Sequence, residues 1–273
     1  MKEQNPNPKT KNLKPETLSM PQLSVTVIAL NQEANIGECL ASVSFADDIV
    51  VVDTGSTDRT VDVARTYTDR IFVAPWQGFG RTKNYALDQA RGDWVFSLDT
   101  DERVPIALQD EIRAVVKADG PLNGYRVPRK NYFCGRWIRH LGWYPDYTLR
   151  LFRRDQGRFR DREVHEEVLV AGPVGQLQTP LDHYSYRSVS EYVIRMDRYA
   201  RLAAMELAKR GRRPHPGELV YRPFFNFLHL YVWRRGFLEG TTGYTLAVLM
   251  STYKFLKYYY LRELARGRDL DGH

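Results

Sequence analysis

The chain has 273 residues, of which 43% are hydrophobic and 27% charged, and its 40 Lys and Arg against 33 Asp and Glu give a net charge of +7. This is the balance of an ordinary globular protein, and it excludes a disordered or fibrous chain. The two cysteines, Cys39 and Cys134, are too few for a disulfide framework or a four-thiolate zinc site.

Charge is distributed unevenly along the chain. Residues 1–180 contain 24 basic and 24 acidic side chains, whereas residues 181–273 contain 16 basic and 9 acidic ones, an excess of seven. A neutral N-terminal part followed by a basic, aromatic-rich C-terminal part indicates two functions in one polypeptide.

Residues 1–20 are expected to form a disordered leader. They contain Pro6, Pro8, Pro15 and several lysines, and they lack the apolar core of a secretory signal. No later stretch reaches the ~18 uninterrupted apolar residues of a membrane-spanning helix. The most apolar candidates, Phe224–Trp233 and Tyr244–Leu261, are interrupted by polar and charged side chains.

Residues 21–185 are expected to form an α/β domain. Short β-branched or aromatic runs predict strands at Leu23–Leu30, Ile49–Asp53, Arg70–Ala74 and Trp94–Leu98. The alternation predicts a mainly parallel sheet flanked by helices, whose ligands bind beyond the carboxyl ends of the strands.

Amphipathic helices are predicted between and after these strands. One presents Ile36, Leu40 and Val43 on a single face. A later one has Pro105 in its first turn and an apolar face made of Leu108, Ile112, Val115 and Val116. From Gly124 to about Leu181 the pattern is irregular, with strand-like pieces at Thr148–Phe152 and Val164–Val170.

Residues 186–273 are expected to form a basic, helical extension. A helix from about Ser190 to Arg210 has an apolar face made of Tyr192, Met196, Tyr199 and Ala203. Another face carries a basic stripe of Arg195, Arg198 and Arg201. After a turn at Gly211–Gly217, two more amphipathic helical segments run to about Arg266.

Polar residues follow the first two predicted strands. Leu30–Ile36 (LNQEANI) combines a strand end with a helix start, which makes either a seat for a base or phosphate or a plain capped turn. Asp53 ends the second strand, where its carboxylate can accept a hydrogen bond from a base or ribose, and Gly55 permits a sharp turn. A methyltransferase-type acidic loop is a rival interpretation, but it requires a second glycine near Ser56 that is absent.

The sharpest signal follows the fourth predicted strand. Asp99 and Asp101 lie on the same side of an extended segment (SLDTDE). Two carboxylates there suit a hard cation such as Mg²⁺ or Mn²⁺, completed by phosphate oxygens, which stabilises a diphosphate leaving group. An acidic surface turn is the alternative.

Other candidates flank this motif. The segment GFGRTKNYA (residues 78–86) opens a helix, from which Arg81 or Lys83 can reach a diphosphate. Downstream, Glu166 is positioned to take a proton from an acceptor hydroxyl, or is a solvated side chain. Weaker candidates for contacts to a base or metal are Asp146, Asp182 and His183, while Arg150 and Arg153 can either bind phosphate or pair with acids.

Together these motifs resemble the inverting glycosyltransferases of family 2, which have the GT-A fold. The resemblance rests on VTVIALNQEANI, VVDTGSTDRT and GRTKNYALDQARGDWVFSLDTDE. The later VHEE, LDHYSYRS and GFLEGTTGY segments look like the branch that adds glucose to the inner core of bacterial lipopolysaccharide. One departure is visible, since many members carry two acids after the second strand and this chain has Asp53-Thr54.

The resemblance implies a role for each matching residue. The nucleotide-sugar would be held by Leu30, Asn31, Glu33, Asp53, Lys83, Asn84 and Asp99. Asp101 would ligate the Mg²⁺ or Mn²⁺ that bridges both phosphates, and Glu166 would be the catalytic base. The implied reaction is a single in-line displacement that converts a UDP-α-sugar into a β-linked product.

The implied acceptor is a lipid-anchored saccharide, a heptose of the lipopolysaccharide inner core. The basic stripe and Tyr258–Tyr260 are then expected to draw the enzyme to the anionic cytoplasmic leaflet as a cytoplasmic, peripheral membrane protein. Alternatives are a family 2 enzyme with another lipid-linked or protein-linked acceptor and an S-adenosylmethionine-dependent methyltransferase. Nucleic acid is not an expected partner, because its phosphates would be repelled by the acidic pocket of the neutral half.

Overall fold

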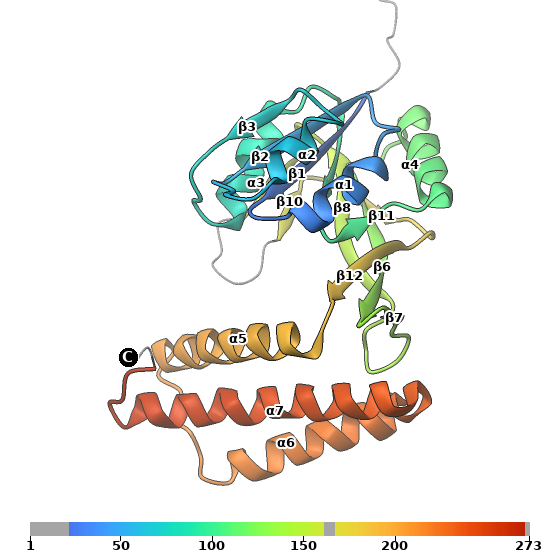
Figure 1. Ribbon diagram of the computed structural model, residues 1–273. Coiled ribbons are helices and arrows are strands. Elements are labelled where there is room, and N and C mark those ends of the chain that lie inside the picture. The colour runs from blue at the N-terminus through green and yellow to red at the C-terminus, as the bar shows by residue number, and fades with distance from the viewer. Residues whose placement is uncertain (1–21, 161–166, 271–273) are drawn as a thin grey trace, which may run out of the picture.

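The structure is a computed structural model that describes residues 22–160 and 167–270. Figure 1 shows an α/β part and, beneath it, a layer of helices. The strands β6 (Gly124–Phe133) and β12 (Leu181–Tyr186) run down from the α/β part toward the helices. The chain therefore connects the two parts through continuous sheet.

Four parallel strands form the first half of the main sheet. They are β1 (Leu23–Ala29), β2 (Asp48–Asp53), β3 (Ile71–Val73) and β4 (Trp94–Leu98), in the order β3-β2-β1-β4. All four strands predicted from the sequence are confirmed. Because they are parallel, the segments after Ala29, Asp53 and Leu98 emerge at one edge, where ligands are expected.

The sheet then changes direction. Its second half comprises β8 (Asp146–Arg153), β6 (Gly124–Phe133), β12 (Leu181–Tyr186) and β5 (Glu102–Arg103), in that order after β4. β8 is antiparallel to β4 and to β6, and β12 is parallel to β6. Two short strands pair with β6, namely β7 (Arg136–Trp137) and β11 (Val174–Gln176), and β9 (Gly157–Phe159) pairs with β10 (Val168–Val170).

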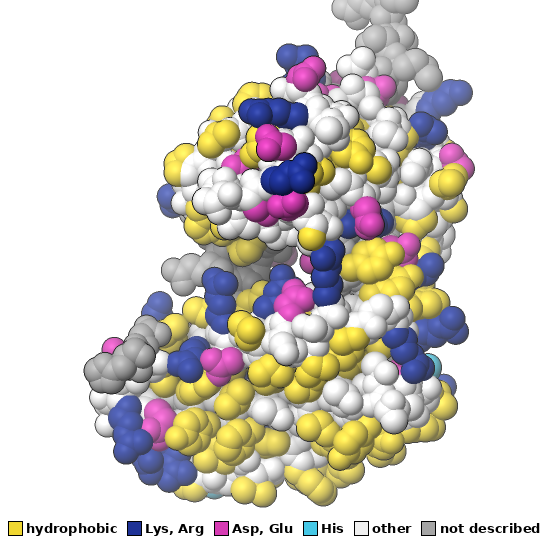
Figure 2. Space-filling model, viewed as in Figure 1, with side chains coloured by type: hydrophobic (Ala, Val, Ile, Leu, Met, Phe, Trp, Pro, Cys, Tyr) yellow, Lys and Arg dark blue, Asp and Glu magenta, His cyan; other side chains and the backbone are white. Residues whose placement is uncertain are grey.

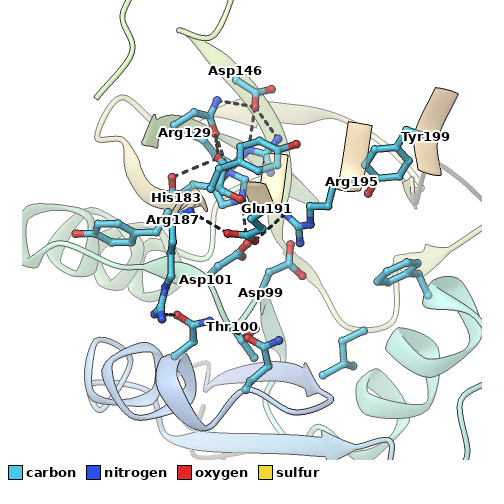
Figure 3. Close-up of a pocket in the computed structure, with 18 of the residues that line it drawn as sticks. Asp99, Thr100, Asp101, Arg129, Asp146, His183, Arg187, Glu191, Arg195 and Tyr199 are labelled. Atoms are coloured by element: carbon cyan, nitrogen blue, oxygen red, sulfur yellow. Dashed lines mark hydrogen bonds and ion pairs between the residues drawn. The ribbon is translucent and has the colours of Figure 1, made fainter. Parts of the chain in front are cut away.

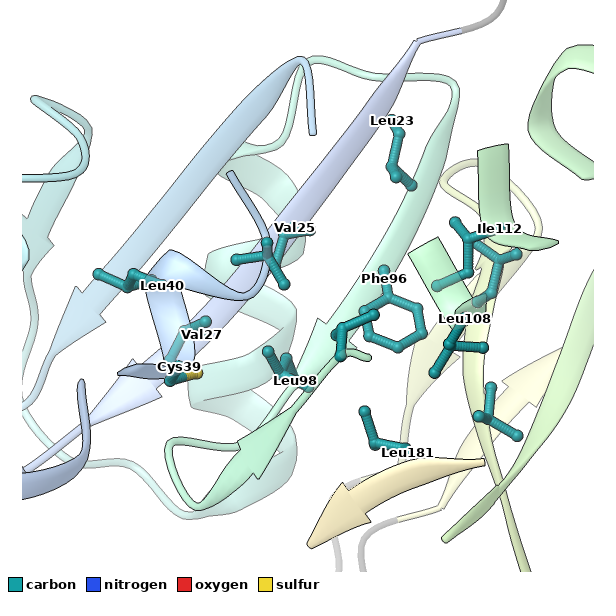
Figure 4. Close-up of a cluster of buried hydrophobic side chains, with 14 of the residues drawn as sticks. Leu23, Val25, Val27, Cys39, Leu40, Phe96, Leu98, Leu108, Ile112 and Leu181 are labelled. Atoms are coloured by element: carbon teal, nitrogen blue, oxygen red, sulfur yellow. The ribbon is translucent and has the colours of Figure 1, made fainter. Parts of the chain in front are cut away.

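Helices cover both faces of this sheet, as predicted. On one face lie α1 (Glu33–Ala41), α2 (Thr60–Ala64) and α4 (Ile106–Ala118), and on the other lies α3 (Phe79–Gln89). Side chains alternate accordingly, since Val51 joins the cluster of α1 and α4 whereas Val50 and Val52 pack with Ala86 of α3. Figure 4 shows the larger cluster, in which side chains from the strands meet those of α1 and α4.

The long strand β6 is missing from the sequence prediction, which left this region irregular. Its sequence, GYRVPRKNYF, lacks the apolar alternation of a strand because Arg129 and Asn131 project toward polar groups instead of a core. β8 extends the predicted Thr148–Phe152 at both ends. The predicted strand Val164–Val170 is described only from Glu167 onward, where β10 forms.

The helical layer comprises α5 (Val189–Lys209), α6 (Glu218–Leu228) and α7 (Gly240–Ala265), with a π-helical turn η1 (His229–Trp233) and a 3₁₀ turn η2 (Gly236–Glu239) between the last two. α7 lies between α5 and α6 (Figure 1), and residues of all three helices share one hydrophobic cluster. The predicted helices of the extension are confirmed. In α5 the buried face consists of Tyr192, Met196, Ala200 and Ala204, so Tyr199 turns away from this core.

A buried glutamate fastens the helical layer to the β7–β8 connection. Glu239 is 3% exposed and accepts hydrogen bonds from the backbone N–H groups of Arg139 and His140 and from His140 Nδ1 at 2.7–3.2 Å. Burial alone would raise the pKa of Glu239, but these bonds outweigh it and hold the pKa below the ordinary value. The carboxylate therefore stays ionised in the folded protein at neutral pH.

The predicted basic stripe of α5 is divided in the structure. Arg201 binds Asp197 at 2.9 Å and lies over the ring of Tyr260, whereas Arg195 and Arg198 line a cavity described below. Tyr258 is buried, and Tyr260 donates a hydrogen bond to Asp197. These side chains therefore serve packing and the cavity, and they do not form one continuous outer surface. Within the described residues, no helix is long and apolar enough to cross a bilayer.

Candidate active site

A cavity of about 1030 Å³ opens at the carboxyl edge of the sheet. Its walls come from the ends of β1 and β4, from the strands β6, β8 and β12 and from α5. Further lining residues are Trp76, Phe79, Leu141, Gly142, Trp143 and Met250. Figure 3 shows Asp99 and Asp101 beneath His183 and Asp146, with Glu191 near the centre of the view and Arg195 and Tyr199 to one side. The cavity therefore brings together residues from both halves of the chain.

Asp99 is held by two cations. Lys83 Nζ lies 2.7 Å from Asp99 Oδ1, and Arg150 Nη2 lies 2.5 Å from Oδ2. Burial would raise the pKa of Asp99, but the guanidinium of Arg150 and the ammonium of Lys83 hold it far below the ordinary value. Asp99 is consequently ionised, and both of its oxygens are engaged.

Arg150 also binds Glu102, which is completely buried. Arg150 Nη2 lies 2.5 Å from Glu102 Oε1, and Glu102 Oε2 accepts the backbone N–H of Asp99 at 3.0 Å. The predicted pairing of Arg150 with acids is thus confirmed. One guanidinium from β8 fixes the turn that follows β4.

Asp101 differs from Asp99 in its partners and not in its exposure, since the side chains are 23% and 29% exposed and only Asp99 is paired with two cations. Its backbone carbonyl accepts the N–H of Tyr184 at 2.8 Å, which places the turn against β12. Its carboxylate lies 3.5 Å from His183 Nε2. Asp101 and His183 both line the cavity.

The contacts of His183 assign its tautomer. His183 Nδ1 lies 2.6 Å from Asn131 Oδ1, while Asn131 Nδ2 donates to the carbonyl of Trp143 and to Asp146. Because an amide oxygen only accepts, Nδ1 carries the hydrogen and Nε2 presents a lone pair in the neutral ring. Two acceptors, Nε2 and the carboxylate of Asp101, therefore flank one point, an arrangement that suits a divalent cation.

The chemistry of Asp101 and His183 fits Mg²⁺ or Mn²⁺, but these two residues provide only part of the coordination sphere. Among the described residues, no three His, Cys, Asp or Glu side chains are grouped closely enough to hold a metal ion. Asp101 and His183 offer two ligands, so water and phosphate oxygens would have to supply the others, as is usual for Mg²⁺.

Asp53 fixes the loop after β2 with one carboxylate oxygen, while its other oxygen has no hydrogen-bond partner among the described residues. Its Oδ2 accepts the N–H groups of Gly55 and Ser56 at 3.1 and 3.0 Å. Its Oδ1 is buried and has no hydrogen-bond partner within the part of the chain that the structure describes. Gly55 has φ of +104°, which explains the glycine in this turn. Asp53 is 3% exposed and is not among the residues that line the cavity, so this unpaired oxygen lies behind the cavity wall.

Asn31 and Glu33 hold the same loop from the other side. Asn31 Oδ1 accepts the N–H of Thr57 at 2.9 Å, and Glu33 Oε2 accepts the N–H of Arg59 at 3.2 Å. Neither residue is among those lining the cavity, whereas Leu30, 47% exposed, is. The structure gives Asn31 and Glu33 a positioning role in this loop.

Lys83 and Asn84 lie in the first turns of α3. Lys83 is 3% exposed and reaches the site through Asp99. The side-chain amide of Asn84 exchanges two hydrogen bonds of 2.9 Å with the backbone of Phe159 in β9. Asn84 thus pins β9 to α3 with both of its polar atoms.

Glu166, the expected base, lies outside the described residues. Its neighbour Glu167 pairs with Arg160 at 3.3 Å, and both side chains are about half exposed. Of the weaker candidates, Asp146 and His183 line the cavity, whereas Arg153 pairs with Asp119.

Several cavity residues were not singled out from the sequence as site residues. Arg129 pairs with Asp146 at 2.6 Å, and Glu191 accepts the N–H of Arg187 at 2.9 Å near the start of α5. The available signal was the SVSE pattern at residues 188–191, which marks a helix start. Nothing in the sequence indicated that this helix start faces the acidic turn after β4. Further residues of this kind are Asn131, Trp143, Tyr184 and Tyr186.

Comparisons with known proteins agree on one family. The family model described as Glycosyl transferase family 2 matches residues 24–169. The lipopolysaccharide core biosynthesis glycosyltransferase LpsC of Rhizobium meliloti (strain 1021) is 34% identical over 246 residues, which are 83% of this chain and 89% of that protein. An uncharacterized glycosyltransferase of Rickettsia typhi is 27% identical over 258 residues, 90% of this chain and 88% of that protein.

Among solved structures, the mannosyltransferase PcManGT from Pyrobaculum calidifontis, in complex with GDP-Man and Mn²⁺, superposes with a TM-score of 0.52. It is 16% identical, and the match covers 93% of this chain and 90% of that one. This likeness concerns the fold, and the predicted GT-A fold is confirmed.

We predict that Arg150→Met destabilises the protein by about 3–5 kcal/mol, because the buried Glu102 would lose its nearest cation and Asp99 one of its two cations. Urea unfolding measures the change. The matched control is Arg158→Met, whose pair with Asp88 is 61% and 52% exposed and should contribute at most ~1 kcal/mol. Equal losses in the two variants would contradict a special role for Arg150.

Proposed function

The chain belongs to glycosyl transferase family 2, and on this premise we propose that it transfers glucose from a UDP-sugar to a heptose of a lipopolysaccharide inner core. The observation that carries the donor half of the proposal is the open pair Asp101 and His183 beside the fixed Asp99. The acceptor half rests on the similarity to LpsC. Family membership also decides against the methyltransferase alternative.

The donor nucleotide occupies the carboxyl edge of β1, β2 and β4 in this proposal. Asp53 Oδ1 accepts a hydrogen bond from the uracil, and Leu30 packs against the nucleoside. Asn31 and Glu33 keep the loop after β2 in place by their bonds to Thr57 and Arg59. Asp99, oriented by Lys83 and Arg150, accepts from the ribose; Asn84 supports the wall behind Lys83.

Asp101 and His183 are the residues that would hold Mg²⁺ or Mn²⁺. Asn131 fixes the ring of His183 so that Nε2 points at the same space as the carboxylate of Asp101. When bound, the ion neutralises the charge that develops on the diphosphate leaving group. Asp99 is already paired with two cations, so Asp101 is the carboxylate left for this purpose.

The reaction we propose is a single in-line displacement. Glu166 takes the proton of the acceptor hydroxyl, whose oxygen attacks the anomeric carbon while the bond to UDP breaks. Attack opposite to the leaving group converts a UDP-α-sugar into a β-linked product. The walls contributed by Trp143, Tyr184 and Tyr186 offer aromatic surface on which sugar rings can pack.

The α5 wall of the cavity is the acceptor side in this proposal. Arg195 donates a hydrogen bond to the carbonyl of Ser185 at 3.1 Å and lies 3.9 Å from Glu191, whereas Arg198 forms no hydrogen bond or ion pair with another described residue. Tyr199 is 44% exposed beside them. Guanidinium groups that face a cavity favour an acceptor that carries phosphate or carboxylate groups.

An acceptor anchored in lipid brings the enzyme to a membrane, so we propose peripheral association with the inner face of the cytoplasmic membrane. The excess of seven positive charges in residues 181–273 supports this location. The second candidate is a family 2 enzyme with another lipid-linked or protein-linked acceptor.

We predict that UDP binds the wild-type protein more tightly with Mn²⁺ than without it, and that Asp101→Ala loses this metal dependence. Calorimetric titration of UDP with and without Mn²⁺ measures both. Asp62→Ala, a 68% exposed carboxylate on α2, is the control and should behave like wild type. Failure of wild type to bind UDP in either condition would overturn the proposed donor.

We predict that Glu166→Gln lowers kcat by about 10²–10⁴-fold while UDP binding is retained, because the general base is lost. The comparison variants are Glu167→Gln, the neighbour paired with Arg160, and Glu191→Gln, a carboxylate that lines the cavity. Steady-state assays with donor and acceptor would identify the base as Glu191 if only the third variant loses kcat.

We predict that Arg198→Gln raises KM for the acceptor by about tenfold or more and leaves UDP affinity unchanged, because one charge-assisted hydrogen bond is lost. The control, Arg201→Gln, lies one turn further along α5 and pairs with Asp197 instead of facing the cavity. A rise in the UDP dissociation constant of Arg198→Gln would place this arginine on the donor side.

A further inference from the structure

The outer side of α6 is apolar where a helix in water would normally be polar. Its exposed residues recur at helical spacing along one side and continue into η1; they are Val220, Tyr221, Phe224, Phe225, Leu228 and Val232, with Trp233 at the end. Phe224 is 56% exposed, Phe225 61% and Trp233 80%. We call these seven residues the outer α6 face.

This face is not the packing surface of α6. The opposite side of the helix, with Phe227, Leu230 and Tyr231, packs into the cluster shared with α7 and α5. Figure 2 shows hydrophobic side chains gathered over the lower helices. An exposed aromatic stripe of this length is unusual for a protein surface that faces only water.

The charges around this face have one sign. Between residues 211 and 265 the chain contains eight Lys and Arg but only three acids, Glu218, Glu239 and Glu263. All three acids are under 9% exposed, and each is paired with an arginine or histidine. The segment therefore presents cations to its surroundings and no exposed carboxylate.

The exposed cations flank the apolar stripe along the chain. Arg212 and Arg213 precede α6, and Arg234 and Arg235 follow η1; all four are exposed. Basic residues beside exposed Trp, Tyr and Phe are typical of elements that lie in the interface of an anionic bilayer. A protein partner would need both an apolar surface for the aromatic stripe and acidic groups for the flanking arginines. An anionic bilayer provides both without any specific contact.

We propose that the outer α6 face docks onto an anionic lipid bilayer, with its aromatic side chains in the headgroup region and the flanking arginines at lipid phosphates. This inference rests on the proposed function only in the expectation that a lipid-anchored acceptor is met at a membrane. It replaces the basic stripe of α5 as the membrane contact, because Arg195 and Arg198 face the cavity.

Docking in this orientation places the cavity away from the lipid. The cavity is lined by α5, and α7 lies between α5 and α6. Two helix-to-helix spacings of roughly 8–10 Å each put the α5 wall about 20 Å from the α6 axis. The acceptor hydroxyl should therefore be carried by a sugar that is separated from its lipid anchor by other sugar units.

The test is co-sedimentation with vesicles of phosphatidylethanolamine and phosphatidylglycerol. Wild type should bind, and Phe224→Ser/Phe225→Ser and Trp233→Ser should each bind about tenfold less tightly, because exposed apolar surface no longer enters the interface. Arg234→Gln/Arg235→Gln should weaken binding at low salt and have little effect at high salt. Ile106→Ser is the matched control, since Ile106 is 75% exposed on α4 of the α/β part.

Three results would overturn the proposal: unchanged binding of the Phe and Trp variants, an equal loss in Ile106→Ser, or binding of wild type to pure phosphatidylcholine as tight as to anionic vesicles. Light scattering separates the rival occupant, because a wild-type dimer that the Phe224→Ser/Phe225→Ser variant converts to monomer would assign the face to a second copy. UDP titration of every variant without vesicles reports the donor site independently, so failure of docking is distinguishable from failure of the proposed function.

Discussion

The active-site edge depends on a buried guanidinium between two carboxylates. Arg150 comes from β8, which runs antiparallel to β4, and it binds both Asp99 and Glu102 in the turn that β4 leads into. Two carboxylates this close would repel one another without the cation, and Glu102 has no access to water. With the turn fixed in this way, Asp99 is engaged on both oxygens and Asp101 projects into the cavity. The reversal of strand direction at β8 therefore brings Arg150 to the acidic motif and fixes its turn.

The strands that follow this reversal in the sheet, β6 and β12, also connect the two parts of the molecule. β6 and β12 continue past the α/β core, and Phe133 and Tyr186 at their ends pack against Tyr192 of α5. Residues along these strands, Asn131 and His183, stand opposite Asp101 on the way. The helical layer is thus held by the strands that build the site. Its inner helix supplies Arg195 and Arg198 to the cavity, while its outer helix carries an apolar face on the other side.

The sequence pattern predicted strands correctly where most side chains of a segment are buried in an apolar core. The strands β1, β2 and β4 are mostly buried and rich in apolar residues, so their ends, and with them Asp53, Asp99 and Asp101, were located correctly. β6 was missed because Arg129 and Asn131 face a polar site, which removes the alternation that identifies a strand. The arginines of α5 were assigned to a membrane surface because a helical periodicity gives only the side of a helix and not the object that it faces.

The sequence by itself determined the family, the parallel half of the sheet and the acidic turn after β4, since these depend on local hydrophobic patterns and on short motifs. Only the tertiary structure decided that Asp99 pairs with two cations whereas Asp101 lies beside a histidine, because Lys83, Arg150 and His183 come from three distant segments. It also decided that α5 faces the cavity and α6 faces outward. The contacts of the two carboxylates and the orientation of the two helices depend on packing between elements that are far apart in the chain. Such packing produces no periodic pattern in the sequence.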